Sequence, residues 1–194
     1  MEEIRAFVAV ELLPEAQAAL GSVSEALAGR IPPGSVRWVR PELIHLTLRF
    51  LGETVVSQLP SISAALDEVG RQSGPLTLRL GPVGCFPTCK RPRVIWVGLE
   101  GDLRSLAALQ RRVEEALVPL GWAAEKRPFQ PHLTLGRVKD VGQVSRVSWE
   151  VKVEAVAVAV TAVVLVQSQL QRSGPDYTNL HVSRLSPAGL TAGL

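Results

Sequence analysis

The sequence contains the tetrapeptide His-Leu-Thr-Leu twice, at residues 45–48 and 132–135, and these copies hold two of the three histidines of the chain. In an extended strand, alternate side chains point to opposite faces. Each histidine therefore shares a face with its threonine, and the two leucines take the other face. Apolar residues flank both copies, which is typical of half-buried strands. The sequence predicts two strands that each hold an imidazole and a hydroxyl over a polar groove.

The spacing of the two copies indicates an internal duplication. The histidines lie 87 residues apart, at positions 45 and 132, and a predicted helix precedes each copy. Such a repeat is typical of pseudo-twofold symmetry, which would bring the motifs face to face across a cleft. We therefore expect an α+β fold of two lobes, with duplicated antiparallel sheets, outer helices and a central cleft. Because strands from one half of the sequence can join the other lobe, residues 1–194 are expected to form a single domain.

Hydrophobic periodicity, proline and glycine predict the order of the elements. Helices are predicted from Pro14 to about Gly29, from Val55 to Val69 and from Leu103 to Leu117, the last with the clearest apolar stripe. Strands are predicted at residues 5–11, 36–39, 44–51, 76–83, 94–99, 131–137, 151–166 and 177–183. Residues 185–194 are expected to form a flexible tail.

The residue types in the repeated motif point to acid and base chemistry. An imidazole transfers protons near neutral pH, and a threonine hydroxyl donates a hydrogen bond to an anionic oxygen. Two facing pairs place an acid and a base on either side of one anion, which suits in-line displacement at phosphorus. The candidate catalytic residues are therefore His45, Thr47, His132 and Thr134. The arrangement does not require a metal, and two histidines without neighbouring carboxylates are a poor set of metal ligands.

With these motifs the sequence resembles the two-histidine (2H) phosphoesterase superfamily, which is defined by paired H-x-T/S-x motifs. More narrowly, it resembles the bacterial and archaeal RNA 2′,3′-cyclic phosphodiesterases, also called 2′-5′ RNA ligases. The resemblance covers nearly the whole chain except residues 185–194. The matching positions are 5–10, 38, 45–52, 85–87, 92–98, 129–137, 168, 174–175 and 177.

The resemblance implies metal-independent hydrolysis of an RNA 2′,3′-cyclic phosphate to a 2′-phosphomonoester, without a cofactor. It assigns His45 as the proton donor to the leaving oxygen and His132 as the proton acceptor that activates water. Thr47 and Thr134 would donate hydrogen bonds to the nonbridging phosphate oxygens. The reverse reaction, 2′-5′ ligation of RNA ends, is expected to be a minor activity because water is the more abundant acceptor.

Three further residues are candidate substrate contacts. Arg137 lies five residues after His132 at a family position that meets the substrate, and its guanidinium suits a phosphate or the face of a base. Phe50 lies five residues after His45 at a family position that packs against a nucleobase, and Phe7 is a weaker candidate for the same role. The period of two instead assigns Phe50 to the core, because Leu48 lies on the apolar face. Both interpretations of Phe50 stay open.

Other functions fit the same residues. A 2H hydrolase of another cyclic phosphate would use the same motifs, and a non-catalytic RNA-binding module would use the basic and aromatic residues. The net charge of +3 is compatible with a phosphate-bearing partner but too small to identify one. The expected partner is RNA with 2′,3′-cyclic phosphate ends, such as tRNA fragments. The chain is expected to be a monomer without an obligate protein partner.

The sequence also indicates the environment of the protein. The acidic start Met1-Glu2-Glu3 is unlike a cleavable signal, and the longest apolar stretch, residues 153–166, is too short and too β-branched for a membrane helix. We therefore expect a cytoplasmic protein that does not enter a membrane. Cys85 and Cys89 lack the second pair that a structural zinc site needs. Reduced, partly buried thiols are expected for them, since disulfides form in oxidising compartments.

The remaining aromatic residues and the third histidine are expected to be structural. Trp38 and Trp96 lie in β-rich apolar segments, which favours positions in the core. His181 lies outside any H-x-T-x motif and is expected to be a strand residue without a catalytic role. Tyr177 and Ser168 are interpreted as structural positions of the family rather than catalysts.

Overall fold

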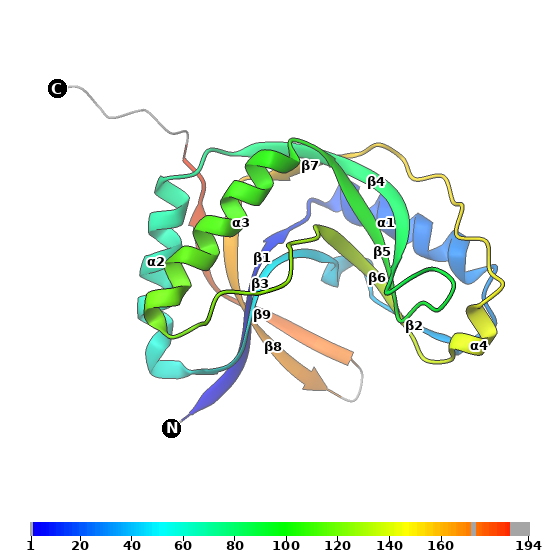
Figure 1. The fold of residues 1–194 in the computed structure, drawn as a ribbon, viewed down its shortest axis with the longest axis horizontal. Helices are drawn as coiled ribbons and strands as arrows, with labels where there is room; N and C mark the ends of the chain where they lie inside the picture. Colours follow the sequence, from blue (N-terminus) through cyan, green and yellow to red (C-terminus); the bar gives the residue numbers. More distant parts are fainter. Residues whose placement is uncertain (1, 172–173, 187–194) are drawn as a thin grey trace.

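The computed structural model describes residues 2–171 and 174–186. Its strands are β1 (Glu3–Glu11), β2 (Val36–Trp38), β3 (His45–Val55), β4 (Leu76–Phe86), β5 (Val94–Gly101), β6 (His132–Val138), β7 (Ala157–Val160), β8 (Ala162–Gln171) and β9 (Gly174–Arg184). Its α-helices are α1 (Pro14–Ala28), α2 (Leu59–Arg71), α3 (Leu103–Leu117) and α4 (Val141–Val144), and its 3₁₀ helices are η1 (Pro41–Leu43), η2 (Val56–Gln58) and η3 (Val118–Leu120). Figure 1 shows the helices along one side of a curved sheet.

The strands form one antiparallel sheet, and its symmetry follows the repeated motif. The order is β7-β4-β5-β6-β3-β1-β8-β9, and β2 pairs with β6 beside this path. At the centre, β3 and β6 pair through Leu46 and Leu133. These leucines hold the same position in the two tetrapeptides, so a pseudo-twofold axis passes between them. The expected α+β fold with pseudo-twofold antiparallel sheets is confirmed, and the two sheets join into one where the motifs meet.

Each half of the sheet combines segments from distant parts of the chain. One half contains β7, β4, β5 and β6, and the other contains β3, β1, β8 and β9. Helix α1 follows β1 along the chain but packs near β6 and η1, whereas α3 follows β5 but packs against β3 and α2. Figure 1 shows α2 and α3 together at one end of the sheet and α1 at the other end. Both halves therefore depend on the whole chain.

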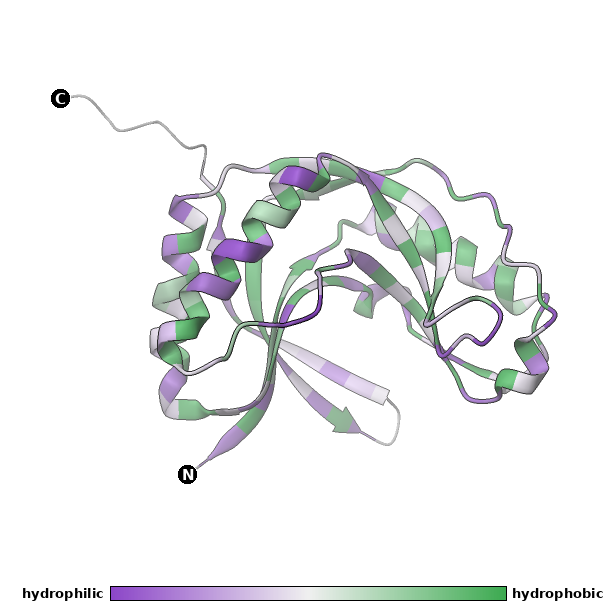
Figure 2. Cartoon of the chain, viewed as in Figure 1, coloured by the Kyte–Doolittle hydropathy of each residue, from purple (hydrophilic) through white to green (hydrophobic). Residues whose placement is uncertain are grey.

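The main hydrophobic core lies between the helices and one face of the sheet, here called the helix face. In α3 the buried residues of the predicted apolar stripe are Leu106, Leu109, Val113 and Leu117, whereas Leu103 at its start is 40% exposed. Figure 2 shows hydrophobic and hydrophilic residues alternating along this helix. Burying one such leucine contributes roughly 2 kcal/mol relative to exposing it. Packing of these stripes therefore fixes the sheet against its helices.

A second, smaller cluster lies on the opposite face of the sheet, here called the open face. Phe7 and Ala9 of β1 are buried there against Val164 and Val166 of β8, with Tyr177 packed beside them. The intervening residues of β1 belong to the main core. Strand β1 is thus covered on both faces, and its aromatic residue provides a floor for the open face.

The predicted elements differ from the structure mainly at their ends. The predicted strand at 151–166 is two strands, because β7 pairs with β4 and β8 pairs with β1, at opposite halves of the sheet. The second helix begins at Leu59 rather than Val55, since β3 extends through Val55. Leu185 is buried in the core and not in a tail. Ser186 is exposed, and the other residues of the expected tail, 187–194, lie outside the described residues. Within the part that the structure describes, no helix has the length and apolar character needed to cross a membrane.

The two cysteines form a disulfide, so the prediction of reduced thiols is wrong. Cys85 lies near the end of β4, and the chain turns back at once, with the Arg93 amide donating to the Phe86 carbonyl. This turn brings the Cα atoms of Cys85 and Cys89 to 5.0 Å, within the range that a disulfide spans. The spacing of the cysteines in the sequence did not reveal this turn.

Candidate active site

Both motif histidines are oriented by the same backbone contact. His45 Nδ1 lies 2.9 Å from the carbonyl oxygen of Leu43, and His132 Nδ1 lies 2.7 Å from that of Gln130. In each case the partner is two residues earlier. Because a carbonyl oxygen only accepts, Nδ1 carries a hydrogen, and Nε2 is the basic nitrogen of the neutral ring. Each ring therefore has Nε2 available for proton transfer.

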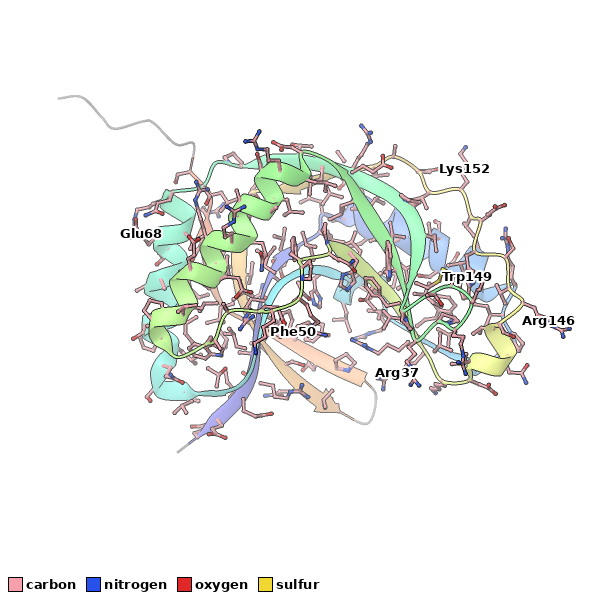
Figure 3. All side chains as sticks on the ribbon, in the orientation of Figure 1. Arg37, Phe50, Glu68, Arg146, Trp149 and Lys152 are labelled. Carbon is pink, nitrogen blue, oxygen red and sulfur yellow. A yellow bond between two sulfur atoms is a disulfide. The ribbon has the colours of Figure 1, made fainter. Side chains whose placement is uncertain are left out.

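A β-bulge at Leu48 decides which face the later residues of β3 occupy. Thr47 and Arg49 pair with consecutive residues of β1, which leaves Leu48 as the extra residue. An extra residue inverts the alternation of side chains beyond it. Phe50 is therefore 67% exposed and lies on the open face, where its ring is 6.2 Å from that of Phe7. The assignment of Phe50 to the core is wrong, and Figure 3 labels its side chain on β3.

Strand β6 has the same bulge at the equivalent leucine, Leu135. Two consecutive residues of β5 pair with the residues on either side of it. Arg137 therefore lies on the same face as His132, just as Phe50 lies on the same face as His45. Burial raises the pKa of Tyr177 on β9, and the positive charge of Arg137 opposes that rise. The guanidinium of Arg137 therefore acts across the open face toward the other half of the sheet.

Two aromatic side chains enclose His45. The Phe7 ring stacks on the imidazole at a centroid distance of 4.7 Å and an interplanar angle of 25°. Tyr177 meets the imidazole edge-on at 5.3 Å. Sequence reasoning placed Phe7 among the substrate contacts, but the structure shows it buried at 4% exposure beneath the histidine. Its direct contact is thus with the imidazole, whose orientation it helps to fix.

The surroundings of His45 change its protonation. Burial of the ring lowers the pKa of His45 below its ordinary value of 6.5. The hydrogen bond to the Leu43 carbonyl opposes this shift, the neighbouring charge of His132 adds to it, and the carboxylate of Glu11 opposes it. Burial disfavours the charged form of a histidine. His45 is therefore a neutral base at pH 7 in the free protein.

Phe86 and Trp96 line the second imidazole. Phe86 meets His132 edge-on at 4.9 Å, and the Trp96 ring centre lies 6.3 Å from that of His132. The indole lies over Gly84, where it leaves no room for a side chain. Trp96 is thus on the open face, and its assignment to the core is wrong, whereas Trp38 does pack against the core. No sequence pattern marks this position, because it follows from the pairing of Trp96 with the motif threonine across β5 and β6.

Arg49 attaches the first motif to the helices. Its guanidinium lies 3.0 Å from the Glu114 carboxylate on α3, and both side chains are nearly buried, at 12% and 14% exposure. It also donates to the Ala123 carbonyl. The bulge at Leu48 places Arg49 on the helix face rather than beside the imidazole. This arginine supports the strand and does not face the candidate chemistry.

We expect Arg49→Ala to lower the free energy of unfolding by about 3 kcal/mol, because it leaves a carboxylate buried without its partner. Urea denaturation followed by circular dichroism measures this change. Arg71→Ala is the matched control, since Arg71 pairs with Glu68 on the surface, where both side chains are more than half exposed. Such a pair contributes at most about 1 kcal/mol. Equal effects of the two substitutions would contradict a supporting role for Arg49.

His181 lies in β9, as predicted, and joins that strand to α2. Its Nε2 is 2.7 Å from Asp67 Oδ1, and the Ser183 hydroxyl donates to the same oxygen at 2.7 Å. The His181 hydrogen bond is the largest cause of the lowered pKa of Asp67. His181 is therefore engaged in a contact between helix and strand.

The structure brings the predicted site residues onto three neighbouring strands. His45, Thr47 and Phe50 come from β3, Phe7 from β1, and His132, Thr134 and Arg137 from β6. The pairing of Leu46 with Leu133 places the two histidines on either side of the pseudo-twofold axis. Among the described residues, no group of three or more histidine, cysteine, aspartate or glutamate side chains is placed to hold a metal ion. The arrangement thus presents two imidazoles and two hydroxyls around one central position.

Comparison with known proteins identifies the family of the chain. Residues 37–172 match the model of the 2′-5′ RNA ligase superfamily. A protein of Thermus thermophilus named RNA 2′,3′-cyclic phosphodiesterase is 38% identical over 189 residues, which cover 91% of this chain and 88% of the relative. A protein of the same name from Methanothermobacter thermautotrophicus is 31% identical over 187 residues, which cover 94% of this chain and 100% of the relative.

Solved structures show the same similarity in three dimensions. The crystal structure of E. coli LigT complexed with 3′-AMP has a TM-score of 0.78 and 27% identity, and the alignment covers 95% of this chain and 99% of that chain. The family model spans well over half of the sequence, and both motifs lie within it. This chain belongs to the 2′-5′ RNA ligase superfamily.

Proposed function

We propose that this protein hydrolyses RNA 2′,3′-cyclic phosphate ends to 2′-phosphomonoesters by acid and base catalysis from two histidines, without a metal. The observation that carries the proposal is the pairing of Leu46 with Leu133, which sets two His-x-Thr motifs symmetrically about one position. The Thermus and Methanothermobacter relatives carry the name of this activity. RNA with cyclic ends, such as tRNA fragments, is the proposed substrate.

The reaction uses the two free Nε2 atoms in opposite senses. His132 takes a proton from water, whose oxygen attacks phosphorus, and the bond from phosphorus to the 3′ oxygen breaks in line. His45 gives a proton to that leaving oxygen, so the products are a 2′-phosphate and a 3′-hydroxyl. Thr47 and Thr134 donate hydrogen bonds to the nonbridging oxygens as charge builds on them.

His45 takes up a proton from the solvent when the substrate binds. The free protein holds this imidazole neutral, because burial lowers its pKa. A cyclic phosphate is an anion, and an anion beside a histidine favours the charged form. Binding therefore raises the pKa of His45 and converts it from a base to the acid that the leaving oxygen needs.

Phe50 and Arg137 are proposed to bind the nucleoside at the edges of the site. Both lie five residues after a catalytic histidine, and both are exposed on the open face because of the duplicated bulge. An exposed aromatic ring stacks on a base, and a guanidinium contacts phosphate or the face of a base. One motif thus contributes an apolar platform and the other a positive charge.

Hydrolysis of adenosine 2′,3′-cyclic phosphate and of a short RNA with a cyclic end, in the presence of EDTA, tests the proposed function. We expect a 2′-phosphomonoester from both, identified by chromatography against 2′- and 3′-phosphate standards. Turnover that chelation abolishes would contradict metal-independent chemistry. If the folded protein binds RNA but opens neither substrate, it is an RNA-binding module. Turnover restricted to other cyclic phosphates would assign it to a different 2H hydrolase.

Reverse 2′-5′ ligation is the second candidate, and the description of the family favours it. The same catalytic groups would support ligation when a 5′-hydroxyl attacks the cyclic phosphate in place of water. We propose that it is minor, since water competes for the site. Incubation with preannealed tRNA halves that carry a cyclic phosphate and a 5′-hydroxyl measures the ligated fraction, and ligation exceeding hydrolysis would reverse this order.

The pH dependence of kcat/KM is expected to be bell-shaped, because one histidine must be charged while the other is neutral. The acid limb should have its midpoint below pH 6.5, since burial lowers the pKa of His45 in the free protein. The acid limb marks the uptake of the second proton by the pair of histidines, after which no neutral imidazole remains to take a proton from water. Steady-state rates measured from pH 4.5 to 9 test this, and a flat profile would contradict paired imidazole catalysis.

A further inference from the structure

A cavity of about 530 Å³ adjoins His45. Its walls come from the second half of β1, the start of α1, the segment of η1 before the first motif, and strands β8 and β9. Phe7 and His45 line one side of it, whereas Phe50 and Arg137 are not among its lining residues. The cavity is therefore continuous with the catalytic position but separate from the proposed nucleoside platform.

The apolar walls of the cavity suit a flat ring. Phe7 and Tyr177 meet edge to face at 5.3 Å, and Val166 forms part of the buried floor between them. A volume of this size is typical of a small-molecule subsite. Tyr177, whose ring is partly exposed beside this space, favours a heteroaromatic guest, which gains aromatic contacts.

The acidic side chains of the cavity are Glu11 and Glu42, which lie beside neutral polar groups. Asn179 Nδ2 donates to Glu11 Oε1 at 2.8 Å, which holds the Glu11 carboxylate in place across β8. A carboxylate has about four acceptor positions, so both oxygens of Glu11 can accept from a ligand in addition to the Asn179 contact. Glu42 adds a second carboxylate to the lining. None of the lining residues within the described ranges is lysine or arginine. The cavity therefore suits a neutral group that presents N–H donors, and it is unfavourable for a phosphate.

We propose that this cavity binds the base of the nucleotide that precedes the cyclic phosphate end of the RNA, and that it prefers guanine. The inference rests on the proposed function, which places the cyclic phosphate beside His45 and the terminal base at Phe50. Guanine alone presents two adjacent donors, N1–H and the N2 amino group, on one edge. These match the two oxygens of a carboxylate in a bidentate contact. Adenine, cytosine and uracil each place an acceptor next to their donor.

The test compares two dinucleotides that end in adenosine 2′,3′-cyclic phosphate and begin with either guanosine or adenosine. We expect the wild-type protein to open the guanosine-containing substrate about tenfold faster in kcat/KM. In Glu11→Gln this ratio should fall to near one, because an amide cannot accept from both donors. Glu11 also influences the pKa of His45, which changes both rates alike, so the ratio is the readout. Glu25→Gln, an exposed carboxylate on the far part of α1, is the matched control and should keep the wild-type ratio.

Three results would overturn the proposal: equal rates for the two dinucleotides in the wild type, a preference that survives Glu11→Gln, or a preference that follows the terminal base instead. The third is examined with a dinucleotide whose last base is guanine. Asn179→Ala provides a second variant if Glu11→Gln does not fold by circular dichroism, and it should also reduce the ratio. Adenosine 2′,3′-cyclic phosphate separates the two proposals. If it is opened while the dinucleotides show no preference, only the base subsite is wrong; if nothing is opened, both proposals fail.

Discussion

Replacing either His45 or His132 by alanine is expected to reduce turnover of an RNA 2′,3′-cyclic phosphate by at least about 10²-fold, since each acts as a general acid or base. The loss follows from geometry as well as chemistry. Each ring is held through Nδ1 by a carbonyl two residues earlier, which leaves Nε2 as its proton-transfer atom, and alanine removes that atom. Single-turnover rates with a short RNA substrate measure the effect.

His181→Ala is the control for these substitutions, because His181 pairs with Asp67 between α2 and β9. Its kcat per folded molecule should match that of the wild type. The double variant at His45 and His132 should be little slower than either single variant, since groups that act as a unit are not additive. Full activity in both single variants would remove the histidines from the mechanism.

Substituting Thr47 or Thr134 by valine is expected to lower kcat by about 10²-fold, the usual loss when one donor to a developing oxyanion is removed. Valine keeps the branched shape and removes only the hydroxyl, so the strand should be preserved. KM should change less than kcat, because these hydrogen bonds strengthen as charge builds on the nonbridging oxygens. Thr77→Val on β4, an exposed position, is the control. Unchanged kcat in both motif variants would show that the hydroxyls do not contact the reacting phosphate.

The sequence was informative wherever local periodicity determined the structure. The period of two correctly placed each motif leucine in the core, with Leu46 and Leu133 at 1% exposure or less. The spacing of leucines along 103–117 predicted α3 with its observed bounds. These features depend on neighbours within a few residues, and one sequence is sufficient to find them.

The remaining features depend on partners that are distant in the sequence. The period of two places Phe50 in the core, against the family position that suggests a base contact, because no pattern marks the bulge at Leu48, which arises from the pairing with β1. Trp96 looks like a core residue until β6 is known to lie beside it. The same limit applies to the cavity, since the contact between Glu11 and Asn179 joins residues 168 positions apart.

The exchange of segments between the halves of the sheet has a consequence for synthesis on the ribosome. A nascent chain that ends before β6 lacks the second imidazole, and the half-sheet containing the first one still awaits β8 and β9. Folds dominated by such distant pairings form slowly. The complete site, with both imidazoles on one sheet, is therefore assembled only after β6, β8 and β9 have paired with the earlier strands.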